Sequence, residues 1–329
     1  MKGALVLAAG ALLATGANAA PGKPTLQTRA EFSMGTVFTL SLQAQALPDP
    51  RAAARQVDKL FAGAFAIIRA HDKALSDYDP TSELNRVQPL ARRGPTAVSP
   101  LLCHAIAESV RFGDLSSGAF DITVGPLVRL WGFKDRHFQV PGQAAISRQL
   151  RAGGLDKISL SRDSSGCRLA LGTPGTALDF GGIGKGLALD AGATWLRGQG
   201  VRVAALDAGG SSMVFMGAPE ASPRGWPVLL RDGSRLLWLK DRALASSGDD
   251  QQFFVQNGIR YGHILDPRSG WPVPARAGVT VIGRDATSTD ALSTALMVLP
   301  HDQGDRLADL LDAEVIRSPI QQEQPPEAS

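Results

Sequence analysis

The segment from Leu178 to Asp190 (LDFGGIGKGLALD) constrains the fold of this chain more than any other stretch. A short apolar run ends in an acid, three glycines and a lysine, and an apolar-periodic segment follows directly. This order predicts a strand, a loop and a helix. Glycines let the backbone approach a ligand closely, and the first turn of a helix offers N–H groups to an anion. Together with the charge of Lys185, the segment predicts a site for a phosphorylated ligand.

The segment differs from two common phosphate-binding loops. The Walker pattern requires a glycine where Asp179 stands and Ser or Thr where Gly186 stands. The dinucleotide fingerprint requires a third glycine where Leu189 stands. A tight glycine turn with a solvated lysine is therefore an equal alternative on these residues alone.

Residues 1–19 have the pattern of an export signal. Lys2 gives a positive start, an apolar core runs from Ala4 to Ala14, and Ala17-Asn18-Ala19 is a small-residue cleavage site. The apolar core is too short to span a membrane. We therefore expect a soluble mature protein, cleaved near Ala19, that is periplasmic in a Gram-negative host.

The composition is that of a globular protein and disfavours nucleic-acid binding. Hydrophobic residues make up 44% and charged residues 20% of the 329 residues, and the formal net charge is +3. Acidic and basic residues are interspersed, with no basic run interleaved with aromatics. Residues 20–27 and 319–329 are predicted to be disordered ends, which leaves one domain over residues 28–318.

The chain has only two cysteines, Cys103 and Cys167. They could pair in an oxidising compartment, but their spacing does not show whether they come within bonding distance. Cys103 lies in a helical pattern, where a buried small hydrophobic residue is the more common interpretation. Two cysteines and scattered histidines form no zinc motif.

The order of the predicted elements favours an α+β fold, because helices and hairpins alternate without a βαβ rhythm. Predicted helices cover Arg51–Ala74, Pro100–Phe112, Ile122–Trp131, Ala144–Arg151, Lys185–Arg197, Ser288–Val298 and Gln303–Leu311. Predicted strands cover a pair within Arg29–Leu42 that turns at Met34-Gly35, then Val203–Leu206, Met213–Met216, Pro227–Leu230, Leu236–Leu239, Val279–Ile282 and Val315–Arg317. Residues 253–264 are predicted to form a hairpin with a type I′ turn at Asn257-Gly258.

Two further segments carry side chains suited to catalysis. Asp290 and Thr294 are four residues apart on a predicted helix and so share a face. A carboxylate, a neutral oxygen and ligand phosphates suit Mg²⁺, although a solvated or capping acid is the commoner use of such an aspartate. His263 is a natural proton acceptor near neutral pH, although a core histidine bonded through its ring is more frequent.

Eight segments, in the same order, resemble the ApbE family, the FAD:protein FMN transferases. These are Met34–Thr36, Leu75–Tyr78 with Ser82–Leu84, Gly118–Thr123, Asp179–Gly186, Ala208–Gly210, Ser247-Gly248, His263–Pro267 and Asp290–Thr294. The resemblance covers about residues 28–317. It implies an α+β fold of two interlocked lobes of mixed sheet with flanking helices, and an FAD site between the lobes.

The resemblance also implies a reaction and its partners. FAD is split at its pyrophosphate with the help of Mg²⁺, FMN is placed on a Thr or Ser hydroxyl, and AMP is released. The expected acceptor is an exported or membrane flavoprotein with a Ser/Thr flavinylation motif. Through that acceptor, association with a membrane redox complex is possible.

Individual residues take roles by the same resemblance. Asp290, Thr294 and the backbone carbonyl of Gly184 would bind Mg²⁺, His263 would accept the proton of the acceptor hydroxyl, and Lys185 would hold the pyrophosphate. The residues expected to line the FAD pocket are Met34, Tyr78, Glu83, Asp121, Asp179, Gly182, Lys185, Gly209, Gly210, Ser247 and His263.

The chain departs from the family pattern at four positions. The family usually has alanine at Gly184, an aromatic at Leu187 and Asp or Asn at Ser211, and Asp250 stands where an aromatic is often found. These departures bear on flavin contacts and acceptor preference more than on the chemistry, because the metal, lysine and histidine positions are kept.

Two other functions would also involve binding of FAD. A hydrolase would use the same groups to cut FAD into FMN and AMP with water as the acceptor. A non-catalytic carrier would bind FAD and release it intact, but a carrier does not require a proton acceptor such as His263.

Overall fold

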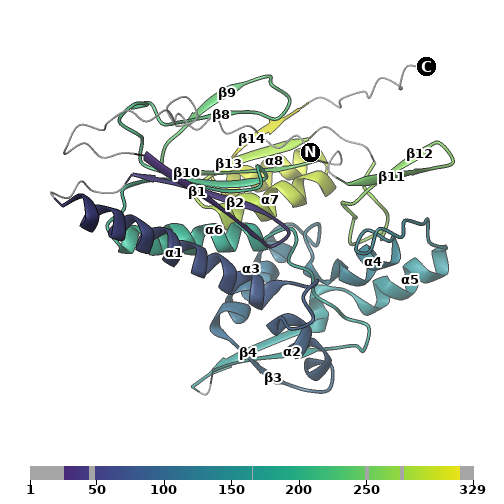
Figure 1. The fold of residues 1–329 in the computed structure, drawn as a ribbon. Helices are drawn as coiled ribbons and strands as arrows, with labels where there is room; N and C mark the ends of the chain where they lie inside the picture. Colours follow the sequence, from purple (N-terminus) through teal and green to yellow (C-terminus); the bar gives the residue numbers. More distant parts are fainter. Residues whose placement is uncertain (1–25, 44–48, 165, 249–251, 275–277, 319–329) are drawn as a thin grey trace.

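The computed structural model describes residues 26–43, 49–164, 166–248, 252–274 and 278–318. Helices and antiparallel sheets are mixed within these residues, which confirms the α+β class (Figure 1). The predicted export signal, the C-terminal tail and Asp250 lie outside the described residues. The first strand begins at Leu26, inside the segment expected to be disordered. No helix of the described chain is both long and apolar enough to cross a membrane.

A seven-stranded sheet forms the centre of the larger lobe. Its order is β1-β2-β6-β7-β10-β13-β14, and every neighbouring pair is antiparallel. The predicted turn between the first two strands is confirmed, with positive φ at both Met34 and Gly35. The strands are β1 (Leu26–Ser33), β2 (Thr36–Gln43), β6 (Val203–Ala208), β7 (Ser212–Met216), β10 (Arg242–Ser247), β13 (Val279–Gly283) and β14 (Glu314–Arg317).

Both faces of this sheet are covered. Helices α1 (Pro50–Leu75), α6 (Gly184–Gly198) and α7 (Ala286–Val298) lie along one face, and the hairpin of β8 (Trp226–Leu229) and β9 (Leu236–Leu239) lies over the other (Figure 1). One apolar core lies between the sheet and these helices, and another lies between the sheet and the hairpin. Strand β7 is buried throughout, and its side chains alternate between these two cores. Val214 packs toward the helices, whereas Phe215 packs toward the hairpin. This explains the continuous apolar run of β7.

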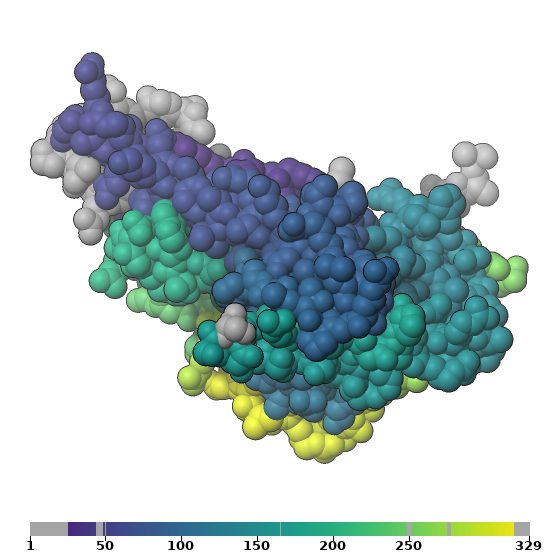
Figure 2. Space-filling view, turned by 90° about the horizontal axis from the view of Figure 1, so that it is seen from below, coloured from purple at the N-terminus to yellow at the C-terminus, as the bar shows by residue number. Residues whose placement is uncertain are grey.

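The smaller lobe contains a three-stranded sheet in the order β3 (Thr96–Val98), β5 (Gly166–Leu171) and β4 (Ile158–Asp163). Helices α2 (Glu83–Ala91) and α3 (Pro100–Leu115) pack against it. Seen from below, these segments occupy the middle of the surface (Figure 2). One continuous core joins this lobe to α7 and to α8 (His301–Leu310).

A disulfide between Cys103 of α3 and Cys167 of β5 ties the helix to the small sheet. The interpretation of Cys103 as a small buried hydrophobic residue is therefore incomplete, since the residue is buried but bonded. The Cα atoms of the two cysteines are 6.1 Å apart, within the range that a disulfide spans. Their separation of 64 residues in sequence hid this proximity.

A separate apolar cluster surrounds Trp131. It gathers α4 (Gly125–Leu130), which follows the 3₁₀ turn η1 (Ile122–Val124), with α5 (Gln143–Ala152) and the hairpin of β11 (Phe253–Gln256) and β12 (Ile259–Gly262). The predicted helix over 122–131 is thus a 3₁₀ turn followed by a short α-helix. The type I′ turn is confirmed, with positive φ at both Asn257 and Gly258. A second 3₁₀ turn, η2 (Leu155–Lys157), leads into β4.

Asp190 fastens α6 to the start of α7. Its carboxylate accepts hydrogen bonds from the backbone amides of Ala286 (2.9 Å) and Thr287 (2.8 Å), and from the Thr287 hydroxyl (2.6 Å). These amides belong to the first turn of α7, where backbone N–H groups lack partners within the helix. A side chain from α6 thus supplies the missing acceptors for α7.

Candidate active site

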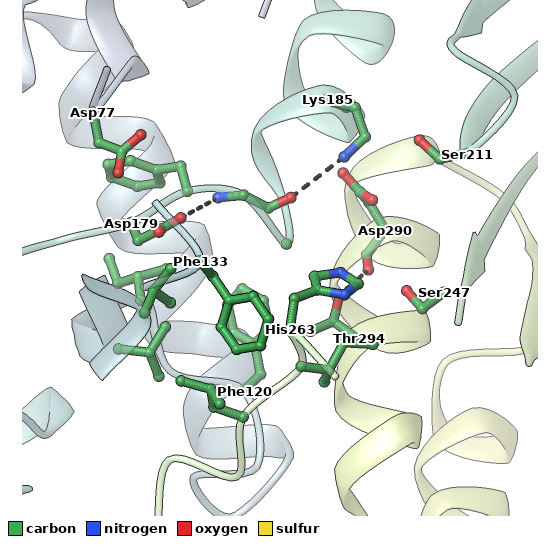
Figure 3. A pocket seen from close by; sticks show the side chains of 18 of the residues that line it. Asp77, Phe120, Phe133, Asp179, Lys185, Ser211, Ser247, His263, Asp290 and Thr294 are labelled. Carbon is green, nitrogen blue, oxygen red and sulfur yellow. Dashed lines mark hydrogen bonds between the residues drawn. The ribbon is translucent and has the colours of Figure 1, made fainter. Parts of the chain in front are cut away.

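A cavity of about 320 Å³ lies where the two lobes meet. Its wall combines the β1–β2 turn, the end of α1, residues 119–124, the glycine-lysine turn, the end of β10, residues 263–267 and α7. Figure 3 shows Asp77 and Asp179 on one side, and Lys185, Asp290 and Ser247 on the other. Segments far apart in sequence therefore contribute to one site.

The glycine-lysine turn leads into α6 as predicted, but the predicted strand before it does not form. Leu178 is buried, and its backbone amide donates to the Gln88 side chain at 2.6 Å. The amide of Asp179 donates to the Ile122 carbonyl at 2.7 Å. Because a side chain and the 3₁₀ segment satisfy these amides, no neighbouring strand is needed. The Asp179 carboxylate accepts the Gly181 amide at 2.7 Å and shapes the turn.

Asp290 lies on α7, where its buried carboxylate faces the glycine-lysine turn. Its Oδ2 atom accepts a hydrogen bond from the Gly186 amide at 2.9 Å, and its Oδ1 atom accepts one from the Ser212 hydroxyl at 3.0 Å. The N-cap of α7 is instead Asp285, whose side chain accepts the Ser288 amide. The interpretation of Asp290 as a solvated acid or as the cap of its own helix is therefore excluded, since its carboxylate accepts from the first turn of α6.

Thr294 follows Asp290 by one helical turn and reaches the glycine segment directly. A Cβ atom added at Gly182 would lie 3.1 Å from the Thr294 hydroxyl oxygen. This separation is tighter than ordinary contact, so the close approach of the turn to α7 depends on glycine there. The structure therefore brings together the turn, the acid and the hydroxyl that the sequence pattern singled out.

His263 follows β12 and lines the same cavity. Its backbone amide donates to the Gln252 carbonyl at 3.0 Å, and its Nδ1 atom lies 3.1 Å from the same oxygen. A carbonyl oxygen only accepts, so the Nδ1 atom carries the proton in this hydrogen bond. The neutral ring then presents Nε2 as its basic nitrogen, which is the state that accepts a proton.

Eight of the residues expected to contact FAD line the cavity: Met34, Tyr78, Asp121, Asp179, Gly182, Lys185, Ser247 and His263. Met34 is held there by Asp72 of α1, whose Oδ2 atom accepts the Met34 amide at 2.8 Å and the Ser33 hydroxyl at 2.9 Å. A side chain of one helix thus fixes the β1–β2 turn at the edge of the site.

Three of the expected contacts lie outside the lining residues. Glu83 accepts hydrogen bonds from the Ser99 amide and hydroxyl, both at 2.6 Å, and so joins α2 to the N-cap of α3. Gly209 and Gly210 have positive φ in the β6–β7 turn, and a Cβ at Gly209 would lie 1.9 Å from the Thr36 hydroxyl. Their positions fit structural roles at the edge of the site.

Three of the four departures from the family pattern lie within the described residues, and only Ser211 among them lines the cavity. Gly184 is the first residue of α6 and lies outside the lining residues. A Cβ there would lie 3.2 Å from the terminal methyl of Met34, a flexible side-chain end. Leu187 is buried in the core that joins the lobes. Ser211 lines the cavity and donates its hydroxyl to the Ala208 carbonyl at 3.0 Å.

The acidic side of the cavity has perturbed proton affinities. Burial, and next the charge of Asp77, raise the pKa of Asp179, whereas the bond from Gly181 and the charge of Lys134 oppose the rise. Burial also raises the pKa of Asp121, against the hydrogen bonds from Thr123. Shifts of this kind are common at ligand sites.

Several residues of the site escaped the sequence analysis. Ser212 and Gln252 hold Asp290 and His263, but neither belongs to a recognisable spacing motif. Phe120 and Phe133 form part of the apolar lining of the cavity. Both are buried, and nothing in the sequence distinguishes them from ordinary core residues. Asp77 belongs to the Leu75–Tyr78 segment of the resemblance, but only its neighbour Tyr78 was expected to contact FAD.

The fold and the site together define an α+β enzyme in which a glycine-lysine turn, an acid on a helix and a histidine share one cavity. The model of the ApbE family matches residues 34–316. The chain belongs to the ApbE family.

Relatives named FAD:protein FMN transferase match this chain over most of their length. The chain is 29% identical to the FAD:protein FMN transferase of Vibrio cholerae over 321 residues, which covers 94% of this chain and 91% of the relative. It is 30% identical to the FAD:protein FMN transferase of Haemophilus influenzae over 256 residues, covering 74% and 73%.

Solved structures agree with these matches. The flavin transferase ApbE from Vibrio cholerae superposes with a TM-score of 0.75 at 27% identity, covering 90% of this chain and 94% of that one. The apo flavinyl transferase ApbE of Pseudomonas stutzeri gives 0.76 at 27% identity, covering 89% and 92%. These neighbours confirm the predicted ApbE fold.

Proposed function

We propose that this chain is an FAD:protein FMN transferase that uses Mg²⁺ to place FMN on a Thr or Ser hydroxyl of a flavoprotein. The names of the relatives support the overall activity. The observation that carries the proposal is the single cavity shared by Lys185, His263, Asp290 and Thr294. A phosphate-binding cation, a base and oxygen ligands for a divalent ion are the groups that phosphoryl transfer requires.

The residues present fit a magnesium ion. Asp290 and Thr294 offer a carboxylate and a hydroxyl beside the glycine turn, whose backbone carbonyls are further oxygen donors. Among the described residues, no group of three or more His, Cys, Asp or Glu side chains could hold a metal. This donor set suits Mg²⁺, which takes few carboxylates and completes its shell with phosphate oxygens and water. When bound, the ion would offset charge on the pyrophosphate.

Two side chains of the cavity serve the transfer itself. The Nε2 atom of His263 takes the proton from the acceptor hydroxyl, whose oxygen then bonds to the phosphorus of the FMN half. The bridging P–O bond breaks, and AMP leaves with the bridging oxygen. The Lys185 ammonium stabilises the negative charge of the phosphates during this step.

The location follows from the N-terminal pattern. An export signal that is cleaved near Ala19 would deliver the enzyme to the periplasm, where its acceptor would be an exported or membrane flavoprotein with a Ser/Thr flavinylation motif. Association with a membrane redox complex would then occur through that acceptor.

Two other uses of the site compete with transfer. A hydrolase would position water in place of the acceptor hydroxyl, and a carrier would leave FAD intact. His263 argues against the carrier, because its ring is set as a base within the cavity.

The test incubates purified protein with FAD, Mg²⁺ and a candidate acceptor, followed by in-gel flavin fluorescence. We expect a fluorescent acceptor band and one AMP per label, with neither formed in EDTA. An acceptor whose target hydroxyl residue is replaced by alanine is the matched control. Free FMN without a labelled band identifies a hydrolase, and FAD that stays intact for hours identifies a carrier.

A further inference from the structure

Asp77 and Asp179 form the acidic wall of the cavity. Lys134, in the segment that follows α4, contacts this wall at Asp77. Its ammonium forms an ion pair with the Oδ2 atom of Asp77, and both side chains are largely buried, at 15% and 10% exposure. Asp77 lines the cavity, whereas Lys134 is not among the lining residues. Lys134 therefore acts on the cavity through Asp77 rather than by direct contact with a ligand.

The same ammonium lies 3.8 Å from the centre of the Tyr78 ring. A cation at this distance from an aromatic face is attracted by the ring quadrupole. Tyr78 is 69% exposed and lines the cavity, so few protein neighbours constrain it apart from this contact. The contact with Lys134 thus restrains a largely exposed aromatic ring in the lining of the cavity.

Asp179 is the third group of this cluster, because its charge interacts with both Asp77 and Lys134. The positive charge of Lys134 favours the ionised form of Asp179 and partly cancels the repulsion from Asp77. One cation thus serves two carboxylates and one ring, all three of which line the cavity. Because a buried carboxylate pair without a counter-charge is costly, loss of Lys134 should disturb this wall, and the charge of Arg129 alone would then favour the ionised form of Asp179.

We propose that Lys134 is a positioning residue of the FAD site, which orients Asp77 and Tyr78 so that the acidic wall can receive a planar ring and hydroxyl donors of the dinucleotide. This assignment rests on the proposed function. The phosphate-handling groups lie on the other side of the cavity, so the acidic wall is suited to the uncharged, donor-rich parts of FAD.

The test replaces Lys134 and measures FAD binding separately from turnover. We expect K134M to raise the Kd and the KM for FAD about tenfold, with kcat at saturating FAD changed by less than about threefold. K134R should recover most of the binding, because it keeps both the charge and the stacking capacity. R284M, which removes the cation of the exposed Arg284–Asp312 pair, is the matched control.

The possible outcomes are separable. Binding of FAD by K134M within twofold of the wild type overturns the proposal, as does a K134R variant that loses binding as fully as K134M. If K134M does not fold, the double variant D77N/K134M, which removes both charges of the buried ion pair, replaces it with the same expected loss of FAD binding. Wild-type protein that does not bind FAD would instead overturn the proposed function.

Discussion

The carboxylate of Asp290 accepts a hydrogen bond from the backbone amide of Gly186, 2.9 Å away on the first turn of α6. This bond joins the acid of α7 to the helix that begins at the glycine-lysine turn. The second carboxylate oxygen is held by Ser212 on β7. Both oxygens are thus oriented before any ligand arrives, which is the preorganisation that electrostatic catalysis needs.

Replacing Asp290 by alanine should lower kcat/KM for flavin transfer at least about 100-fold. The substitution removes the carboxylate that α7 presents to the glycine-lysine turn, and with it the proposed charged ligand of Mg²⁺. The Mg²⁺ concentration for half-maximal activity should rise as well. A magnesium titration of activity, with exposed Asp302→Ala on α8 as the control, measures both effects. Near-normal activity would remove Asp290 from the site.

Replacing His263 by alanine should slow transfer about 100-fold and leave the Kd for FAD within about threefold of the wild type, since the ring is proposed to accept a proton. Single-turnover labelling and flavin fluorescence titration separate the two quantities. A variant that loses FAD binding would show that His263 is a structural or binding residue instead.

Gly186→Ala should destabilise the protein by about 1–3 kcal/mol. The new Cβ atom would lie 2.3 Å from the backbone carbonyl oxygen of Ala286, so α6 and α7 would have to separate. The matched control is Gly198→Ala at the exposed end of the same helix, where nothing lies within 4 Å. That control should stabilise the helix by about 0.5–1 kcal/mol. Urea unfolding compares the two variants, and equal stability would contradict the close helix contact.

Asp207→Asn should stabilise the protein at pH 8 but not at pH 4. Burial raises the pKa of Asp207 to about 6, against the hydrogen bond from the Gly210 amide. A carboxyl whose folded pKa exceeds its unfolded pKa contributes stability at low pH, which is lost as the pH rises through about 6.

Ionising this buried carboxyl lowers the free energy of unfolding by about 3 kcal/mol at pH 8, since the pKa is raised by roughly two units. Asparagine avoids this loss and can still accept the hydrogen bond from Gly210. Thermal unfolding of both proteins at the two pH values measures the effect. A difference in Tm that is the same at pH 4 and pH 8 would refute the assignment.

Reduction of the Cys103–Cys167 disulfide should lower the free energy of unfolding by about 4 kcal/mol, because the bond closes a loop with a sequence separation of 64 residues. Thermal unfolding with and without reductant measures the loss, and a double Cys→Ser variant, which should be insensitive to reductant, is the control. A wild-type Tm that does not respond to reductant once the thiols are shown to be free would contradict this prediction.

The sequence predicted the larger lobe well and the smaller lobe poorly. The strands of the main sheet have continuous or alternating apolar patterns, and β9 occurs over the predicted residues Leu236–Leu239. The small sheet was missed because β4 has only two apolar residues, Ile158 and Leu160, and is mostly exposed. Helix α2 carries an internal proline, Pro89, and β10 is mostly alanine and serine, which favour strands little. Tertiary contacts decide these segments.

The site was predictable where a motif combined a fixed spacing with a chemical reason. Asp290 and Thr294 share a helix face, and Lys185 follows glycines at a helix start, so local sequence was sufficient for them. Lys134 and Ser212 reach the site through the fold alone, since no local pattern relates them to the residues that they contact. Glu83 differs from these residues, because its motif predicts a ligand contact, whereas its carboxylate accepts hydrogen bonds from Ser99 in the structure.

The anchoring of α7 by Asp190 has a consequence for how the enzyme changes shape. Asp190 accepts hydrogen bonds at the start of α7, and Asp290 in the middle of that helix accepts one from Gly186, so we expect Lys185 and Asp290 to move together. We therefore expect any adjustment that admits a dinucleotide to come from the facing side, where the largely exposed ring of Tyr78 rests against Lys134.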